Sequence, residues 1–272
     1  MRRPQRLRHL LAFLAALAAF AAAGSATAEE LYRAQASVTG QGEAERARGF
    51  AICLEAVLIK VSGDPRLAGD PALDTLKAKA SRFVAQFTYR DRMAGIPVHD
   101  EQGTRERPFE LTVDFDPSKI DALLRSLGRS KWPEPRPRLA VLLGVRDATT
   151  AYVLSENGER GLGEREALSE TAARRGIPIA LPNEARLAAD RLDYASLAGA
   201  PAERLAALAR ENGGDAALTG TLVWSDKALG WIAAWQLSWQ GREHRWRISG
   251  VSFDDAFRDA IDHAAAILSG QG

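Results

Sequence analysis

The chain has 272 residues, which is long enough for two modest domains, each with its own hydrophobic core. Its formal net charge of +1 at pH 7 excludes the strongly basic surface that is typical of nucleic-acid-binding proteins. Its single cysteine excludes an internal disulfide bond, so packing alone must stabilise each domain.

The first 28 residues have the three parts of an export signal. Four arginines within residues 2–8 form a positively charged start, residues 10–23 are apolar, and residues 26–28, Ala-Thr-Ala, have the small side chains of a cleavage site. The apolar run is shorter than the ~20 residues that span a bilayer, and no other segment is apolar enough. We therefore expect cleavage after Ala28, a periplasmic location and no stable membrane insertion. The mature chain would have lost four arginines and no acids, so its net charge would be −3.

Residues 29–131 are predicted to form a first domain of α+β class, with the element order β-α-α-β-β-α. Segments that alternate apolar and polar residues are predicted strands, and segments with apolar residues three and four positions apart are predicted helices. We expect strands over residues 31–38, 83–92 and 107–115, helices over residues 43–60, 71–81 and 117–127, and a glycine-containing loop over residues 95–103. Together they predict a sandwich of helices on a small antiparallel sheet.

Individual residues in this domain have predicted structural roles. Cys53 falls on the apolar face of the helix over residues 43–60, which indicates a buried thiol and not a reactive nucleophile. Asp116 is predicted to cap the next helix, with Pro117 at its first position and Gly128 just past its end.

A proline-rich joint is predicted over residues 132–137, which have the sequence Trp-Pro-Glu-Pro-Arg-Pro. Proline lacks the amide donor and fixes φ, so neither a regular helix nor an inner strand can pass through this segment. We therefore place the boundary between the two domains here.

Residues 138–272 are predicted to form a second domain of α/β class. We expect strands over residues 138–145, 177–181, 216–224, 230–240 and 242–249, and helices over residues 164–175, after Pro201 and after Ser252. Pro178 indicates that the second of these strands lies at a sheet edge. Strands that alternate with helices, followed by three strands in succession, predict a mixed sheet with helices packed against it.

Short segments of the first half carry a resemblance to a known family. They are Leu31-Tyr32, residues 60–64 (Lys-Val-Ser-Gly-Asp), residues 83–87 (Phe-Val-Ala-Gln-Phe), residues 113–116 (Val-Asp-Phe-Asp), Trp132 and Arg136-Pro137. In these segments, and in the order of its later elements, the chain resembles the bacterial envelope family catalogued as domain of unknown function 2066. The resemblance implies an exported protein of the cell envelope. It offers no catalytic residue, because that family has no assigned activity.

Residues with the chemistry of metal ligands and nucleophiles are few and scattered. His99, His244 and His263 remain after the signal is removed, and they are widely separated, so no zinc or other metal site is expected. The sequence contains no Gly-x-Ser-x-Gly or Ser-x-x-Lys motif and no glycine-rich loop of the phosphate-binding kind. We therefore expect no catalytic residue and no cofactor.

Tryptophan is the residue type whose distribution is unusual, because five of the six lie between residues 224 and 246. Trp231, Trp235 and Trp239 share one face of a predicted strand. Either this face is the core side of the sheet, or one or two rings reach the surface and bind a partner, a peptide or a sugar. Trp132, Trp231, Trp235 and Trp239 are therefore the candidate partner-binding residues.

These patterns favour a soluble periplasmic protein that serves as a non-catalytic interaction or assembly module of the cell envelope. Its partner would be an envelope protein or a glycan, and not a nucleic acid. Two alternatives stay open. One is an enzyme that hydrolyses or transfers envelope glycans, and the other is a carrier that holds a small ligand between the domains near Trp132.

Overall fold

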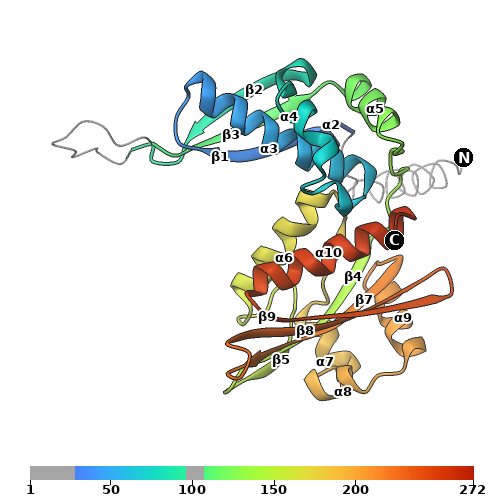
Figure 1. Ribbon diagram of the computed structural model, residues 1–272. Coiled ribbons are helices and arrows are strands. Elements are labelled where there is room, and N and C mark those ends of the chain that lie inside the picture. The colour runs from blue at the N-terminus through green and yellow to red at the C-terminus, as the bar shows by residue number, and fades with distance from the viewer. Residues whose placement is uncertain (1–27, 96–106) are drawn as a thin grey trace, which may run out of the picture.

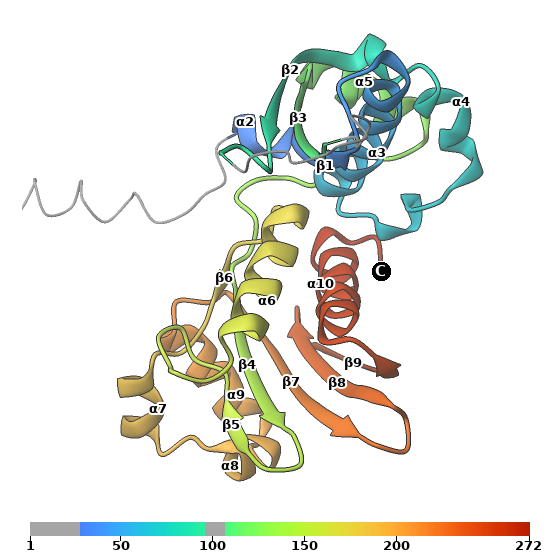
Figure 2. The same ribbon diagram turned by 90° about the vertical axis from the view of Figure 1, so that its left-hand side faces the viewer.

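The computed structural model describes residues 28–95 and 107–272, and it shows an α+β fold with two separate sheets (Figures 1 and 2). We call the described residues up to 131 the N-terminal part and residues 138–272 the C-terminal part. In both views, helices α6 (Leu162–Arg175) and α10 (Phe253–Ser269) lie between the two sheets. The fold class predicted from the sequence is confirmed.

The N-terminal part has a three-stranded antiparallel sheet in the order β1-β3-β2, with α3 packed on one face. Alternate strand residues such as Ala34 and Val113 are buried in the same hydrophobic cluster as α3. The elements are α2 (Ala28–Leu31), β1 (Arg33–Val38), α3 (Glu43–Ser62), α4 (Asp74–Lys77), β2 (Val84–Asp91), β3 (Phe109–Phe115) and α5 (Pro117–Ser126), with 3-10 turns at Pro65–Leu67, Pro71–Leu73 and Ala80–Phe83.

Most local predictions for this part are confirmed, and one helix is not. The Asp116 carboxylate accepts hydrogen bonds from the amides of Ser118 (2.9 Å) and Lys119 (3.2 Å), which is the predicted cap of α5. The single helix predicted over residues 71–81 is wrong, because the chain there forms two 3-10 turns with the one-turn α4 between them. Its apolar face was too weak to hold a continuous helix. Of the predicted loop over residues 95–103, all but Gly95 lies outside the described residues.

Cys53 is buried in the middle of α3, as predicted. Its side chain has no exposed surface, and burial raises the pKa of the thiol to about 12. A thiol with these properties is an inert part of the core.

The joint is fixed by Arg136, whose guanidinium binds the C-terminal ends of two helices. It donates hydrogen bonds to the carbonyl oxygen of Lys60 near the end of α3 (2.8 Å) and to those of Arg175 and Gly176 at the end of α6 (3.0 and 3.1 Å). The guanidinium also lies 4.5 Å from the ring centroid of Trp132, which is 4% exposed. A cation at two helix C-termini meets the negative ends of both macrodipoles.

Gly63 makes the close approach between the two parts possible. It follows α3 with φ 72°, the left-handed conformation that favours glycine at this position. A Cβ atom here would lie 2.6 Å from Cβ of Ser269 and 2.9 Å from Cε3 of Trp132. The Ser269 hydroxyl donates to the Gly63 carbonyl oxygen (3.2 Å), which ties the end of α10 to the same turn.

Lys60 is a buried cation at this junction, and its titration predicts how stability depends on pH. Its ammonium group donates to the carbonyl oxygens of Glu30 (3.2 Å) and Arg33 (2.7 Å), and burial lowers its pKa to about 8. Between pH 8 and about 10.5 the unfolded chain binds a proton at Lys60 that the folded chain does not, so the contribution of Lys60 to the free energy of unfolding should rise with pH.

The change that tests this is Lys60→Met. Relative to this variant, the wild type should gain up to about 3 kcal/mol in the free energy of unfolding as pH rises from 7.5 to 10.5, measured by urea unfolding. The matched control is Lys119→Met, which removes an exposed lysine that also donates to a carbonyl oxygen, that of Arg82 (2.8 Å). It should follow the wild-type pH profile. An unchanged pH profile in Lys60→Met would contradict the prediction.

The C-terminal part contains a mixed sheet in the order β5-β4-β7-β8-β9, with β6 paired to β4 beside β5. Strand β4 is parallel to β6 and β7, and the other pairs are antiparallel. Besides α6 and α10, the elements are β4 (Leu139–Arg146), β5 (Ala151–Val153), β6 (Ile179–Ala180), α7 (Glu184–Asp190), α8 (Tyr194–Ala198), α9 (Ala202–Glu211), β7 (Ala216–Ser225), β8 (Gly230–Trp239) and β9 (Arg242–Val251).

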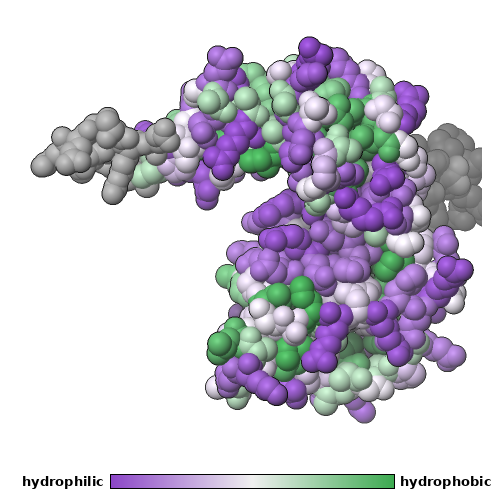
Figure 3. Space-filling view, viewed as in Figure 1, coloured by the Kyte–Doolittle hydropathy of each residue, from purple (hydrophilic) through white to green (hydrophobic). Residues whose placement is uncertain are grey.

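Helices cover both faces of β4, and the chain connections explain why. Strands β6 and β7 lie on opposite sides of β4, and right-handed crossovers to opposite sides place their helices on opposite faces. Leu139 and Val141 therefore pack in the cluster with α6 and α10, whereas Leu142 packs with α7, α8 and α9. This explains the uninterrupted apolar run of β4. In the view of Figure 3, the outer surfaces of α6 and α10 are hydrophilic. Their apolar residues are buried in the cluster with the sheet.

Candidate binding cleft at the sheet edge

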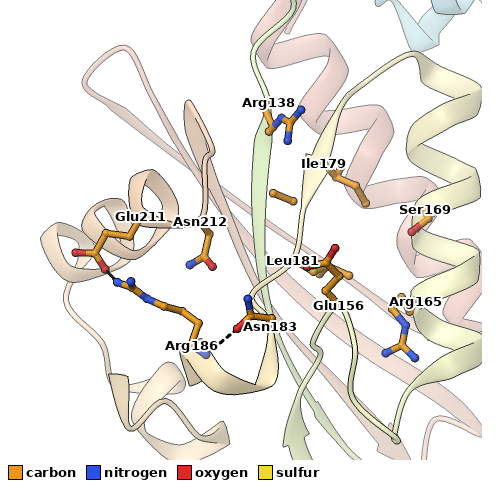
Figure 4. Close-up of a pocket in the computed structure, with 11 residues that line it drawn as sticks. Arg138, Glu156, Arg165, Ser169, Ile179, Leu181, Asn183, Arg186, Glu211 and Asn212 are labelled. Carbon is orange, nitrogen blue, oxygen red and sulfur yellow. Dashed lines mark hydrogen bonds and ion pairs between the residues drawn. The ribbon is translucent and has the colours of Figure 1, made fainter. Parts of the chain in front are cut away.

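A polar cleft of about 740 Å³ lies at the edge of the C-terminal sheet, beside β6. We call it the edge cleft. Figure 4 shows α6 on one side of it and α7 and α9 on the other. Its lining residues are Arg138, Glu156, Arg165, Ser169, Ile179, Ala180, Leu181, Asn183, Arg186, Glu211 and Asn212. The volume is within the range of ordinary ligand sites.

The topology of the sheet assembles this cleft from distant segments. Strand β6 pairs with β4 alone among the described strands, so it is an edge, as Pro178 predicts. The crossover helix α6 brings Arg165 and Ser169 to one side of that edge, and the chain that returns to β7 brings α7 and α9 to the other. The lining residues extend from Arg138 to Asn212, so the site depends on the fold.

Arg186 is held on the α7 side by carboxylates. Asn183 caps α7 by accepting the Arg186 amide (2.8 Å), which fixes where the side chain begins. The Arg186 guanidinium then binds Asp190 (2.7 Å) and Glu211 of α9. These ion pairs join α7 to α9 and largely neutralise the charge of Arg186.

Arg165, on the α6 side, is held by main-chain carbonyl oxygens, whereas Arg186 is held by carboxylates. Its guanidinium donates to the carbonyl oxygens of Ser155 (2.8 Å) and Gly158 (3.1 Å). Carbonyl oxygens fix the orientation of the guanidinium but carry no net charge. The positive charge of Arg165 therefore remains in the wall of the edge cleft.

The segment that Arg165 holds is itself tightly packed. The buried Ser155 hydroxyl donates to the Glu184 carboxylate (2.5 Å), and a Cβ atom on Gly158 would lie 2.3 Å from Ser155 Oγ. The amide of Glu184 donates to Asn157 (2.9 Å), which closes the connection between this segment and α7. The segment that contributes Glu156 to the cleft is thus tied to α7.

Guanidinium, amide, carboxylate and hydroxyl groups are the polar side-chain groups that line the edge cleft. Among its described lining residues there is no histidine, cysteine or lysine, the side chains that commonly act as base or nucleophile beside the carboxylates. In the described ranges, no group of three or more His, Cys, Asp or Glu side chains could hold a metal ion. Guanidinium, amide and strand-edge groups instead suit a ligand with carboxylate and peptide oxygens.

The predicted partner-binding tryptophans lie elsewhere. Trp231, Trp235 and Trp239 lie on one face of β8 and pack in the cluster that contains α10. Trp235 is buried at 2% exposure, whereas Trp231 and Trp239 are half-buried. Trp132 is buried in the joint beneath Arg136, so its ring does not line an open pocket there. The structure does not bring these four residues together, and partner binding by them stays a prediction.

The two remaining histidines of the described chain also lie outside the cleft. His263 forms an i,i+4 pair with Asp259 (3.4 Å) on α10, and its ring stacks on Trp246 of β9 with centroids 5.1 Å apart. Burial raises the pKa of Asp259. His244 is half-buried on β9, and His99 lies outside the described residues. The i,i+4 spacing of Asp259 and His263 favours the first contact, and the fold supplies the stacking on Trp246.

Sequence reasoning did not identify the residues of the edge cleft. The signal that could have located it is the element order: a strand, a crossover helix and then a short strand interrupted by proline indicate an edge beside the first strand. No motif marks Arg138, Arg165 or Arg186, because they lie in separate segments: just before β4, in α6 and in α7.

Comparison with known proteins corrects the family resemblance. A family model described as a domain of unknown function, DUF8605, matches residues 25–133, which is less than half of the chain. This overturns the resemblance to domain of unknown function 2066. No curated protein matches the chain. No helix within the described residues combines the length and apolarity needed to cross a membrane.

Proposed function

We propose that this protein is a non-catalytic binding module of the cell envelope, exported to the periplasm, and that the edge cleft is its binding site. The export part of the proposal is supported by the signal-like sequence of residues 1–28. The observation that supports binding is the composition of the cleft. Guanidinium and amide groups from separate elements converge on an unpaired strand edge, without histidine, cysteine or lysine among the described lining residues.

A photo-crosslinking residue in the cleft tests this proposal. Ser169, which is exposed on α6 and lines the cleft, is replaced by p-benzoyl-phenylalanine in the full chain produced in bacteria. Illumination should give an adduct of defined mass in the periplasmic fraction, carried by a chain that begins at Glu29. The matched control places the same residue at Arg174, which is exposed on α6 but outside the cleft lining, and should give no such adduct.

Absence of an adduct at Ser169, or equal adducts at both positions, would contradict binding in the cleft. A chain that keeps residues 1–28 and remains in the cytoplasm would contradict the export part.

A further inference from the structure

Strand β2 is an edge of the N-terminal sheet, and the direction of its main-chain groups follows from the register. Among the described strands it pairs with β3 alone, and Figure 2 shows it at the margin of the N-terminal part. The amide of Arg92 donates to the carbonyl oxygen of Pro108 (3.2 Å), which continues the register of this pair. Antiparallel pairs alternate, so the even-numbered residues of β2 bond to β3, and the N–H and C=O groups of Phe87 and Tyr89 point away from it. Such an edge is a template for another strand.

The side of β2 that faces α3 carries an exposed aromatic side chain. Helix α3 packs mainly over β1 and β3, so β2 lies at the border of the helix layer. Phe87 is therefore 39% exposed. Its ring lies 5.2 Å from that of Phe50 and 5.8 Å from that of Tyr89, and the Arg46 guanidinium lies 5.8 Å from its centroid. An exposed aromatic ring on an unpaired edge is typical of an interaction surface.

Two other edge strands are less suited to pairing with a second copy of the chain. On β1, the carbonyl oxygen of Arg33 points away from β3 and already accepts a hydrogen bond from the Lys60 ammonium group (2.7 Å). On β9, antiparallel pairing of two copies about Trp246 would place Arg245 of each copy opposite Arg247 of the other. Like charges directly opposite each other destabilise a strand pair.

The sequence of β2 is complementary to itself about Thr88. A register shift at the start of the strand leaves residues 86–91 as its regular part. When two copies of this segment lie antiparallel about a twofold axis at Thr88, Phe87 of each copy is opposite Tyr89 of the other. The two Thr88 residues then face each other. Aromatic pairs and threonine pairs of this kind stabilise antiparallel strands.

The charges of β2 are compatible with this pairing. Its charged side chains are Arg90 and Asp91, and each has a partner in its own chain: Glu110 (2.8 Å) for the first and Arg107 (3.0 Å) for the second. Across the axis, Arg90 of one copy meets the neutral amide of Gln86 of the other. No two like charges of the regular part of β2 therefore lie opposite each other.

We propose that two copies of this chain pair through β2, antiparallel about a twofold axis at Thr88. The N-terminal sheets then join into one sheet in the order β1-β3-β2-β2-β3-β1. Phe87 and Tyr89 exchange main-chain hydrogen bonds with the same two residues of the second copy, and the exposed Phe87 ring is covered. This surface shares no residue with the edge cleft, so the proposal does not rest on binding there.

Disulfide cross-linking of Thr88→Cys tests the axis. Thr88 bonds to β3, so the two copies of this exposed residue form a non-hydrogen-bonded pair, with Cα atoms about 4.5 Å apart. This distance allows a disulfide bond. Oxidation of the full chain by air with copper phenanthroline should give a covalent dimer on a non-reducing gel. The native Cys53 is buried and should not react. Absence of the covalent dimer would overturn the proposal.

Further cysteine variants test the register. With the axis at Thr88, the two copies of residue 86 lie roughly 14 Å apart, which is too far for a disulfide bond. Gln86→Cys alone should therefore give no covalent dimer, whereas a mixture of Gln86→Cys and Arg90→Cys chains should give one. Gln35→Cys is the control for random collision, because Gln35 is exposed in β1 and, like Thr88, pairs with Thr112. If Gln35→Cys or Gln86→Cys cross-linked as readily as Thr88→Cys, the pairing would be wrong.

Phe87→Glu tests the association without an added cysteine. Sedimentation equilibrium of the wild-type full chain should show a monomer–dimer equilibrium. In the variant a carboxylate would be buried opposite Tyr89, so the dissociation constant should rise about tenfold or more. The matched control is Leu162→Glu, which also replaces an exposed apolar residue (59%) but lies on α6, and it should leave the constant unchanged.

A wild-type chain that stays monomeric at every concentration, or an equal effect of the two glutamate variants, would contradict pairing through β2. Should Phe87→Glu fail to fold, the cysteine variants still decide the question.

Discussion

Trp235→Ala is expected to lower the free energy of unfolding by about 3–5 kcal/mol, as removal of a buried aromatic side chain usually does. The ring is 2% exposed and lies edge-on to Phe257 of α10 with centroids 6.4 Å apart. It also covers Gly220 so closely that a Cβ atom there would lie 2.3 Å from Cε3 of Trp235. The surrounding sheet and helix cannot close over the resulting cavity. Urea unfolding at pH 7 measures the loss.

The matched control for Trp235 is Trp224→Ala in the neighbouring strand β7. Trp224 is 40% exposed, and its indole nitrogen donates to the exposed Asp226 (2.8 Å). This variant should lose about 1 kcal/mol or less. Similar losses in the two variants would show that Trp235 does not hold α10 on the sheet.

Asp64→Ala is expected to cost about 2–3 kcal/mol, because it removes a buried carboxylate that two partly exposed arginines bind. The Asp64 side chain has no exposed surface. Its carboxylate accepts hydrogen bonds from the Arg66 side chain (2.8 and 3.1 Å), and the second guanidinium, of Arg129, lies 2.8 Å away. Without the carboxylate, Arg129 is left partly buried beside the end of α3. Urea unfolding compares the variant with the wild type.

The pH dependence of that loss has a defined sign. Burial alone would raise the pKa of Asp64, but the hydrogen bonds and charges of Arg66 and Arg129 outweigh it and lower the pKa. The stabilisation is therefore present above the unfolded pKa of about 4 and is lost as pH falls through the lower folded value. Asp70→Ala, which removes a partly exposed cap of the next 3-10 turn, should cost only about 1 kcal/mol. A loss in Asp64→Ala no larger than in this control would contradict the prediction.

Local sequence patterns predicted the elements that depend on their own residues. The cap at Asp116, the run of β4 and the apolar stripe of α10 each follow from spacing along one segment. The short elements β5, α7 and α8 were missed, since three to seven residues are too few to establish a period. Their positions are set by the sheet edge and the face of β4 that they cover.

The family resemblance was wrong for a related physical reason. Residues 60–64 are explained by the end of α3: a buried lysine, a left-handed glycine and a buried aspartate complete the turn. Many folds must end a helix against a second layer, so such a turn does not distinguish one family from another. The edge cleft was missed because its charged residues come from separate segments between residues 138 and 211 that only the folded topology brings together.

The joint described above also determines how force would pass through the molecule. Helix α6 forms one wall of the edge cleft, and its far end is bound by Arg136, which also binds the end of α3. A helix is stiff along its axis, so α6 behaves as a rod anchored at one end to the N-terminal part. A force that pulled α6 along its axis, away from the N-terminal part, would have to break hydrogen bonds of Arg136. These are its bonds to the end of α6 or its bond to the end of α3. Arg136 and the ion pair of Arg175 with Asp262 of α10 are therefore contacts through which a load on the cleft wall would reach the rest of the molecule.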